Sequence, residues 1–366
     1  MGTTSVVHKE RSAAKIILWI AIFLLFFSVV AFFLVKHLYD KSFTRVDRPE
    51  HSGFIRFSDV ADKLDVTEVQ FPSGLNMLAG YIFSAFGAEN GKGLVVIAHG
   101  LGGGAESYLA ETMYFVEQGW RVFSYDCTGS HSSEGKNTRG LPQSAIDLDA
   151  ALTYVAGNDA LSSLPVMLYG HSWGGYAVTA VLNYDHRNKI NAVASIAGYN
   201  APIEILVEQA SKMIGPFVAY VAYPVEWAYQ KVLFGSAADV TAVDGINNTD
   251  TAVLIIHGTE DQAISYNGAA IIAHRDEITN PNVAYKTCSA ENQNGHSNLF
   301  RSVPATAYIN EKNAEYKQTY EQWKKKIPDD IKAEYYANLD KNLVSELDAD
   351  FMEEVNGFFE AHLNKE

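Results

Sequence analysis

The residues with the clearest chemical potential lie in the peptide Gly170-His171-Ser172-Trp173-Gly174-Gly175, directly after the apolar run 165–169. Ser172 sits in the pattern Gly-x-Ser-x-Gly. Between a strand and a helix, this pattern is typical of a nucleophile elbow, a strained turn that lifts the serine hydroxyl into the open. The turn is crowded, so the flanking positions must be nearly free of side chain. The short pattern alone is only suggestive, and further motifs must support it.

A serine hydroxyl becomes an effective nucleophile when a base takes its proton and an acid orients that base. The expected strand 252–257 is followed by a tight turn that carries Glu260 and Asp261. We expect Asp261 to be the acid, and Glu260 is the alternative. The last expected strand is followed by Asn294-Gly295-His296, which places His296 where the general base should stand. The chemical groups therefore follow in the order serine, acid, histidine.

A fourth motif, His99-Gly100-Leu101-Gly102-Gly103-Gly104, directly follows the expected strand 94–98. Glycine-rich backbone at this point can turn amide N–H groups toward a developing oxyanion, and each such donor contributes about 2.7–4 kcal/mol to catalysis. We expect the donors of this oxyanion hole to be the backbone amides of Leu101 and Trp173, the residue after the nucleophile.

The elements that must position these groups are eight short β-rich runs that alternate with helical patterns. The expected strands are 66–71, 77–83, 94–98, 122–125, 166–169, 192–196, 252–257 and 283–287. The middle runs are almost continuously apolar, as in parallel strands that are covered on both faces. The alternation predicts an α/β fold with an eight-stranded, mostly parallel sheet, helices on both faces and the first two strands joined as a hairpin.

These motifs, each after its own strand, resemble those of the α/β-hydrolases, and within that superfamily the serine aminopeptidase and monoacylglycerol-lipase-like group. The resemblance runs from about residue 66 to residue 300. It includes 125–135, which is similar to the group's Asp-x-x-Gly-x-Gly-x-Ser loop, although Ser130 stands where the second glycine is usual. It implies esterase, lipase, thioesterase or peptidase activity without a cofactor.

Two stretches interrupt the alternation of strands and helices. Residues from about 201 to 250 separate the sixth and seventh strands, and a segment this long is typical of a lid. Its aromatic residues are candidates for lining an acyl pocket, with plain core positions as the alternative: Phe217, Tyr220, Tyr223 and Trp227. Residues from about 305 to 328 form a helical extension outside the common pattern, and 347–363 is an amphipathic helix expected to pack on the sheet.

The N-terminal region predicts a membrane anchor. Residues 16–35 contain no charge and only one polar residue, Ser28, over 20 positions, enough to cross a hydrocarbon core of about 30 Å. We therefore expect a tail at 1–15, a transmembrane anchor at 16–35, a stalk at 36–60 and a hydrolase domain at 61–366. Basic residues flank both ends of the span, so the charge rule discriminates weakly. Our expectation is a single-pass membrane protein with an extracytoplasmic hydrolase domain.

The charge and the cysteine content argue against nucleic-acid binding, a disulfide bond and a metal site. The net charge of −15 repels phosphate backbones, so nucleic acid is not an expected partner, while protein partners are left open by the sequence. Cys127 and Cys288 are expected as free thiols because their strands lie several positions apart. No metal site is expected, since zinc-ligand spacings are absent. Five further histidines are expected to be structural or exposed: His99, His131, His171, His186 and His274.

The sequence thus predicts a membrane-anchored serine hydrolase that acts on an acyl ester or lipid-like small molecule through an acyl-enzyme. A peptidase is the alternative, in which Glu204, Glu208 or Glu226 near the lid would hold a substrate ammonium. Acyl transfer on the same triad also stays open. So does a non-catalytic role, in which the fold binds a ligand or a partner chain.

Overall fold

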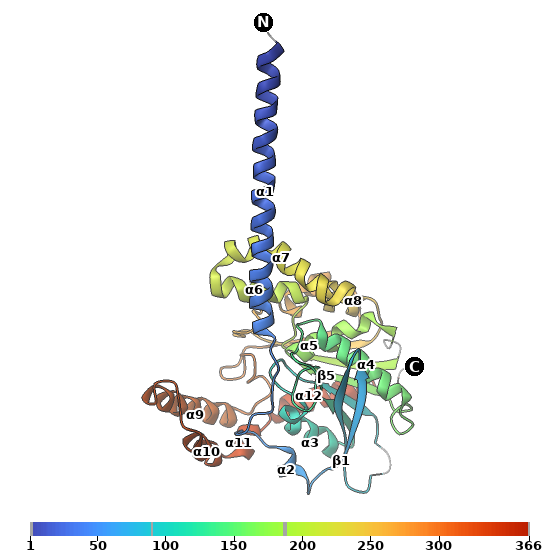
Figure 1. The fold of residues 1–366 in the computed structure, drawn as a ribbon. Helices are drawn as coiled ribbons and strands as arrows, with labels where there is room; N and C mark the ends of the chain where they lie inside the picture. The colour runs from blue at the N-terminus through green and yellow to red at the C-terminus, as the bar shows by residue number, and fades with distance from the viewer. Residues whose placement is uncertain (1–2, 89–90, 186–188, 365–366) are drawn as a thin grey trace.

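A computed structural model describes residues 3–88, 91–185 and 189–364. Its centre is an eight-stranded sheet with helices on both faces, and a long N-terminal helix projects from it (Figure 1). The strands are β1 (Asp65–Ser73), β2 (Asn76–Ser84), β3 (Leu94–Ala98), β4 (Arg121–Tyr125), β5 (Val166–His171), β6 (Ile190–Ile196), β7 (Ala252–Gly258) and β8 (Val283–Cys288). All eight predicted strands are confirmed, with ends within two residues of those expected.

The sheet order is β1-β2-β4-β3-β5-β6-β7-β8. β1 and β2 form the predicted antiparallel hairpin, and β2 also runs antiparallel to β4. The remaining neighbours are parallel. The parallel strands β3, β5 and β7 are buried along their whole length, which explains why their sequences are continuous apolar runs.

Successive residues of each strand supply two separate hydrophobic cores. On β3, Val96 faces the core built with α4 and α5, while Val95 and Ile97 face the core built with α3 and α12. The helices are α1 (Thr3–Ser42), α2 (Phe57–Val60), α3 (Leu109–Glu117), α4 (Gln143–Gly157), α5 (Trp173–Ala180), α6 (Pro202–Ile214), α7 (Pro216–Phe234), α8 (Ala242–Asn247), α9 (Val303–Gln322), α10 (Asp329–Ala337), α11 (Lys341–Ser345) and α12 (Ala349–Ala361). Because α12 buries Phe351, Val355 and Phe359, it is the sheet-packed helix expected from the pattern at 347–363.

Helix α1 contains the apolar stretch and continues beyond it in both directions. Residues 15–42 are long and apolar enough to cross a membrane, and the helix extends back to Thr3 through the segment expected as a tail. The described side chains from Ile16 to Val30 are exposed, and along this stretch the helix stands clear of the rest of the described chain (Figure 1).

The segment 36–60, expected as a stalk, lies against the domain that contains the sheet. Tyr39 and Phe43, one helical turn apart on α1, are buried in the same core as α4 and α5. Beyond the helix, the Arg45 guanidinium donates hydrogen bonds of 2.6–3.0 Å to backbone carbonyls of the 125–135 loop, at His131, Ser133 and Gly135. Helix α1 is therefore joined to the folded domain without a free linker.

Two groups of helices lie at the segments expected as a lid, about 201–250, and as a helical extension, about 305–328. Helices α6 and α7, followed by α8, lie between β6 and β7, and α7 packs beside the lower part of α1 (Figure 1). Helices α9 and α10 project from the other side of the domain (Figure 1), and a tilted contact between the rings of Tyr316 and Tyr335, with centroids 4.8 Å apart, joins them. Cys127 and Cys288 are both free thiols, as expected from their position on distant strands.

Candidate active site

Ser172 occupies a sharp turn between β5 and α5. Its φ of 58° and ψ of −114° are unusual for a residue with a side chain and indicate the strained backbone of a nucleophile elbow. Close contacts with the backbone require glycine at the neighbouring positions Gly170 and Gly174. A Cβ at Gly170 would lie 2.2 Å from the Gly174 carbonyl oxygen, and a Cβ at Gly174 would lie 1.9 Å from the Ala98 carbonyl oxygen.

The structure brings the three predicted catalytic residues together although they come from three strand ends. His296 Nε2 lies 2.9 Å from Ser172 Oγ, and His296 Nδ1 lies 2.7 Å from Asp261 Oδ2. Nδ1 donates to the carboxylate, so Nε2 of the neutral ring is free to accept the serine proton. Glu260, the alternative acid, makes neither contact.

Asp261 is held as a carboxylate by four donors. The amides of Ala263 and Ile264 donate to Oδ1 at 2.8 Å each, while His296 and His257 donate to Oδ2. Burial alone would raise the pKa of Asp261, but the hydrogen bonds from His257, His296 and the Ile264 amide bring it well below its usual range. The acid therefore stays charged and can stabilise a protonated His296.

The two expected oxyanion donors come from the residue after Ser172 and from the loop after β3. Trp173 begins α5, so its amide belongs to the unpaired first turn of the helix. Leu101 lines the cavity next to Ser172, on the loop after β3. Neither amide has a hydrogen-bond partner among the residues that the structure describes, as a preorganised oxyanion hole requires.

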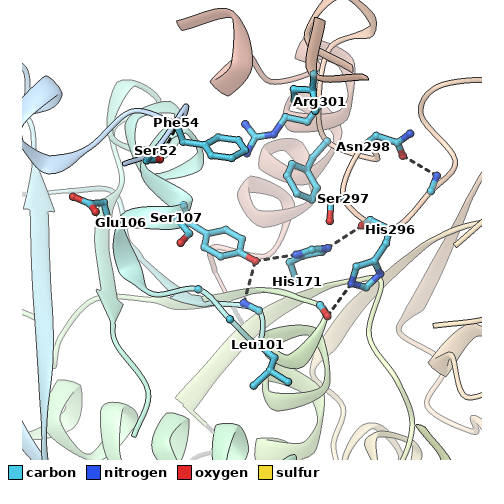
Figure 2. Close-up of a pocket in the computed structure, with 18 of the residues that line it drawn as sticks. Ser52, Phe54, Leu101, Glu106, Ser107, His171, His296, Ser297, Asn298 and Arg301 are labelled. Atoms are coloured by element: carbon cyan, nitrogen blue, oxygen red, sulfur yellow. Dashed lines mark hydrogen bonds between the residues drawn. The ribbon is translucent and has the colours of Figure 1, made fainter. Parts of the chain in front are cut away.

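A cavity of about 600 Å³ opens above Ser172 and His296 (Figure 2). Its walls come from three segments: the loop after β3 with η1 (Ala105–Tyr108), the loop around His296, and the chain between α1 and α2. Helix α9 closes one side with Thr306, Ile309 and Asn310. Arg301, stacked over the rings of Phe54 and Phe300 at 5.4 and 5.1 Å, forms the roof (Figure 2). The volume of this cavity lies in the range of binding sites for small organic molecules.

The four lid aromatics are not part of this cavity. Phe217, Tyr220, Tyr223 and Trp227 are at least 41% exposed, and none of them is among the residues that line the cavity. They lie on α7, whose buried side faces α1 instead of Ser172. The expectation that this segment supplies an acyl pocket is therefore not supported by the geometry.

The acids considered for binding an ammonium group also lie outside the cavity lining. Glu208 accepts hydrogen bonds from Ser265, Ala269 and Lys212, and Glu204 accepts from Asn200. Burial raises the pKa of Glu226. One acid, Glu106, does line the cavity, but it already accepts from the Phe57 amide.

Sequence reasoning missed a hydrogen-bonded link between the oxyanion loop and the His296 loop. The Gly100 amide donates to Tyr108 Oη at 3.0 Å, Tyr108 Oη lies 2.8 Å from His171 Nδ1, and His171 Nε2 lies 2.9 Å from the His296 carbonyl oxygen (Figure 2). A carbonyl only accepts, so His171 Nε2 carries the proton and Tyr108 must donate to Nδ1. Burial, and then the nearby His296, lower the pKa of His171 to about 3, which keeps the ring neutral.

His257 is a second residue that the sequence did not single out. It is fully buried at the end of β7, and its Nε2 lies 2.9 Å from the Ile264 carbonyl oxygen and 3.1 Å from Asp261 Oδ2. The sequence contained a signal for this contact, because His257 stands only four residues before Asp261. The expected structural histidines include His99, which accepts from the Cys127 amide, whereas His186 lies outside the described residues.

Within the described chain, one group of side chains could bring three metal-ligand atoms within 4.8 Å of one another. It consists of Glu50, His51 and Asp329. Both carboxylates are exposed, and the group is not part of the cavity lining.

Comparison with known proteins agrees with this architecture. Residues 89–223 match the family model of the serine aminopeptidases, S33. The fold is similar to that of the Pyrococcus furiosus esterase Pf2001, with a TM-score of 0.52 and 15% identity over 76% of this chain and 98% of that one. A second crystal form of the esterase gives a TM-score of 0.51 and 17% identity, over 76% and 99% of the chains. The chain thus has the α/β-hydrolase fold.

A relative with partial similarity is the quorum-quenching protein AidA of Acinetobacter baumannii, strain MDR-ZJ06. It is 29% identical over 123 residues, which is 33% of this chain. The matched part spans only 40% of that relative's length.

Proposed function

We propose that this chain is a membrane-anchored serine hydrolase that cleaves carboxylic esters of small molecules. The observation that carries the proposal is the hydrogen-bonded series Asp261–His296–Ser172 at an open cavity, which the glycine-rich loop at Leu101 also lines. This arrangement combines an activated nucleophile with preorganised stabilisation of negative charge.

In the proposed reaction, Ser172 Oγ attacks the ester carbonyl carbon while His296 Nε2 takes the hydroxyl proton. The Leu101 and Trp173 amides donate to the carbonyl oxygen as it becomes negative, and the charged Asp261 stabilises the protonated imidazole. Collapse of the tetrahedral intermediate expels the alcohol, which receives the proton from His296, and leaves an acyl-enzyme. Water, deprotonated by the same nitrogen, then releases the acid and restores Ser172.

An ester is favoured over a peptide substrate by the lining of the cavity. Glu204, Glu208 and Glu226 do not reach it, and Glu106 is already hydrogen-bonded, so no free carboxylate within the described lining is placed to hold a substrate ammonium. Two of the similar structures are of an esterase, which agrees with this choice. The lid aromatics give no reason to require a long acyl chain.

The substrate class can be tested with the full-length protein in detergent micelles. Para-nitrophenyl esters of increasing acyl length should be hydrolysed, and amino-acid anilides should be turned over at least about 100-fold more slowly, since no group compensates their charge. Ser172→Ala should abolish ester hydrolysis, whereas Ser163→Ala, an exposed serine away from the cavity, should not. Faster hydrolysis of the anilides would favour the peptidase instead.

We further propose that α1 spans a membrane and places the hydrolase domain on the extracytoplasmic side. Sealed, right-side-out vesicles that contain the protein test this orientation. Added protease should digest the hydrolase domain, and full protection of that domain would place it on the cytoplasmic side.

A further inference from the structure

The cap helices α6 and α7 carry an exposed apolar surface for which the cavity gives no explanation. We define this cap face by six side chains that are 49–82% exposed: Met213, Ile214, Phe217, Val218, Tyr220 and Val221. The sequence contains no charged residue from Met213 to Val225. Soluble proteins rarely leave a contiguous apolar surface of this kind in water.

Another residue of α7, Tyr229, fixes the position of the cap face relative to the anchor helix. Tyr229 contacts Phe32 and Tyr39 of α1 edge to face, at ring-centroid distances of 5.6 and 5.3 Å. Its hydroxyl donates to Asp40 at 2.5 Å and lies 3.4 Å from Lys36 Nζ. Helix α7 therefore lies beside the last turns of α1 (Figure 1).

These contacts place the cap at the edge of the apolar span. Phe32 lies within the apolar stretch 16–35, only three residues, or about 4.5 Å along the helix axis, before its end. A bilayer that covers the exposed side chains of residues 16–30 would therefore have its surface at the level of α7. Aromatic side chains such as Tyr220 and Tyr223 are enriched at that depth.

The attachment of α1 keeps the cap at this level. Tyr39 and Phe43 are buried in the hydrolase core, and Arg45 is hydrogen-bonded to three backbone carbonyls, so no flexible linker separates the anchor from the domain. Because α1 and the domain are joined in this way, the hydrolase cannot move away from a bilayer that contains α1.

We propose that the cap face is a membrane-docking surface, which inserts into the boundary between headgroups and acyl chains beside α1. The occupant is a lipid bilayer. The inference rests on the proposed membrane anchoring, and it reassigns Phe217 and Tyr220 from substrate binding to lipid contact. The hydrolase would thus be held in one orientation on the membrane by two adjoining elements.

Fluorophores attached at single cysteines test the proposal in the full-length protein, reconstituted into phosphatidylcholine vesicles. Cys288→Ser removes the more accessible native thiol, and Cys127 is fully buried. Phe217→Cys and Tyr220→Cys report on the cap face. Leu75→Cys, at the fully exposed β1–β2 turn, is the control for water, and Ile22→Cys is the control for the anchor.

Labels at 217 and 220 should be quenched by aqueous iodide about fivefold or more weakly than the label at 75, because the apolar boundary excludes a hydrated anion. Equal quenching at 217, 220 and 75, with the label at 22 protected, would overturn the docking surface and leave the anchor intact. Strong quenching at 22 would overturn the anchoring and the docking surface together. Hydrolysis of a soluble ester, measured on the same samples, reports separately on the proposed function.

Discussion

Removing the Tyr108 hydroxyl tests whether the link between the oxyanion loop and the His296 loop supports the active site. In Tyr108→Phe, the Gly100 amide loses its acceptor and His171 Nδ1 loses its donor, and both are buried. Each unpaired group costs about 1–3 kcal/mol, so the free energy of unfolding should fall by about 2–6 kcal/mol. With an unfolding entropy near 0.6 kcal/mol/K for roughly 300 residues, the thermal midpoint should fall by about 3–10 °C.

The same change should lower kcat more than it changes KM. Gly100 precedes Leu101, the proposed oxyanion donor, and the His296 carbonyl is the last acceptor of the link, so both proposed catalytic elements lose a restraint. A displacement approaching 1 Å would reduce kcat by about 10- to 100-fold. Thermal unfolding in detergent and hydrolysis of a soluble ester measure the two effects.

Tyr169→Phe is the matched control. Tyr169 is also fully buried, but its hydroxyl has no hydrogen-bond partner among the described residues, so we expect a midpoint within about 2 °C of the unmodified protein and unchanged kcat. If Tyr108→Phe were as stable and as active as Tyr169→Phe, the reasoning about the link would be refuted.

Three further predictions concern the acid, the buried histidines and the elbow. Asp261→Asn should reduce kcat by about 10³- to 10⁴-fold with the fold retained, and a loss below tenfold in ester hydrolysis would contradict its role. Burial lowers the pKa of His99, His131 and His171. The unfolded chain therefore binds more protons in mild acid, and the stability present above about pH 6.5 should be lost as the pH falls. His171 alone accounts for about 2 kcal/mol between pH 6.5 and 5, and denaturation curves of His171→Asn should show a smaller loss. Gly174→Ala should prevent folding or abolish activity, because the new Cβ would meet the Ala98 carbonyl oxygen, whereas Gly157→Ala meets nothing within 4 Å and should match the unmodified protein in melting and activity assays.

The parts of the site that follow strands could be predicted from the sequence. Ser172, Asp261 and His296 each come directly after an apolar run, and parallel strands bring their carboxyl ends to one edge of the sheet. The same reasoning placed the glycine-rich loop at Leu101 beside the serine. Local patterns were therefore sufficient for the strands and for the arrangement of the triad.

The walls of the cavity could not be predicted in this way. Phe54 and Ile309 reach it from the segment after α1 and from α9. The approach of Phe54 depends on how Tyr39, Phe43 and Arg45 attach the N-terminal segment to the domain. The composition of 36–60 indicates a polar stalk, because two buried aromatic residues leave little trace in a short segment.

The lid aromatics illustrate a second limit of prediction from the sequence. Their helical spacing and apolar character fit a pocket wall, a core or a lipid-facing surface equally well, and only the contact of Tyr229 with α1 shows which way α7 faces. His171 was expected as a structural or exposed histidine, but its contact with Tyr108 was missed, since the two residues are 63 positions apart and no sequence pattern connects them.

Labelling of Ser172 tests the central claim most directly. The full-length protein should react with a fluorophosphonate at a single site, and peptide mass analysis should place the adduct on Ser172. Labelling should disappear in Ser172→Ala and persist in Ser163→Ala. An adduct on a different residue, or no reaction in a folded sample that binds ester substrates, would contradict an activated serine at the elbow.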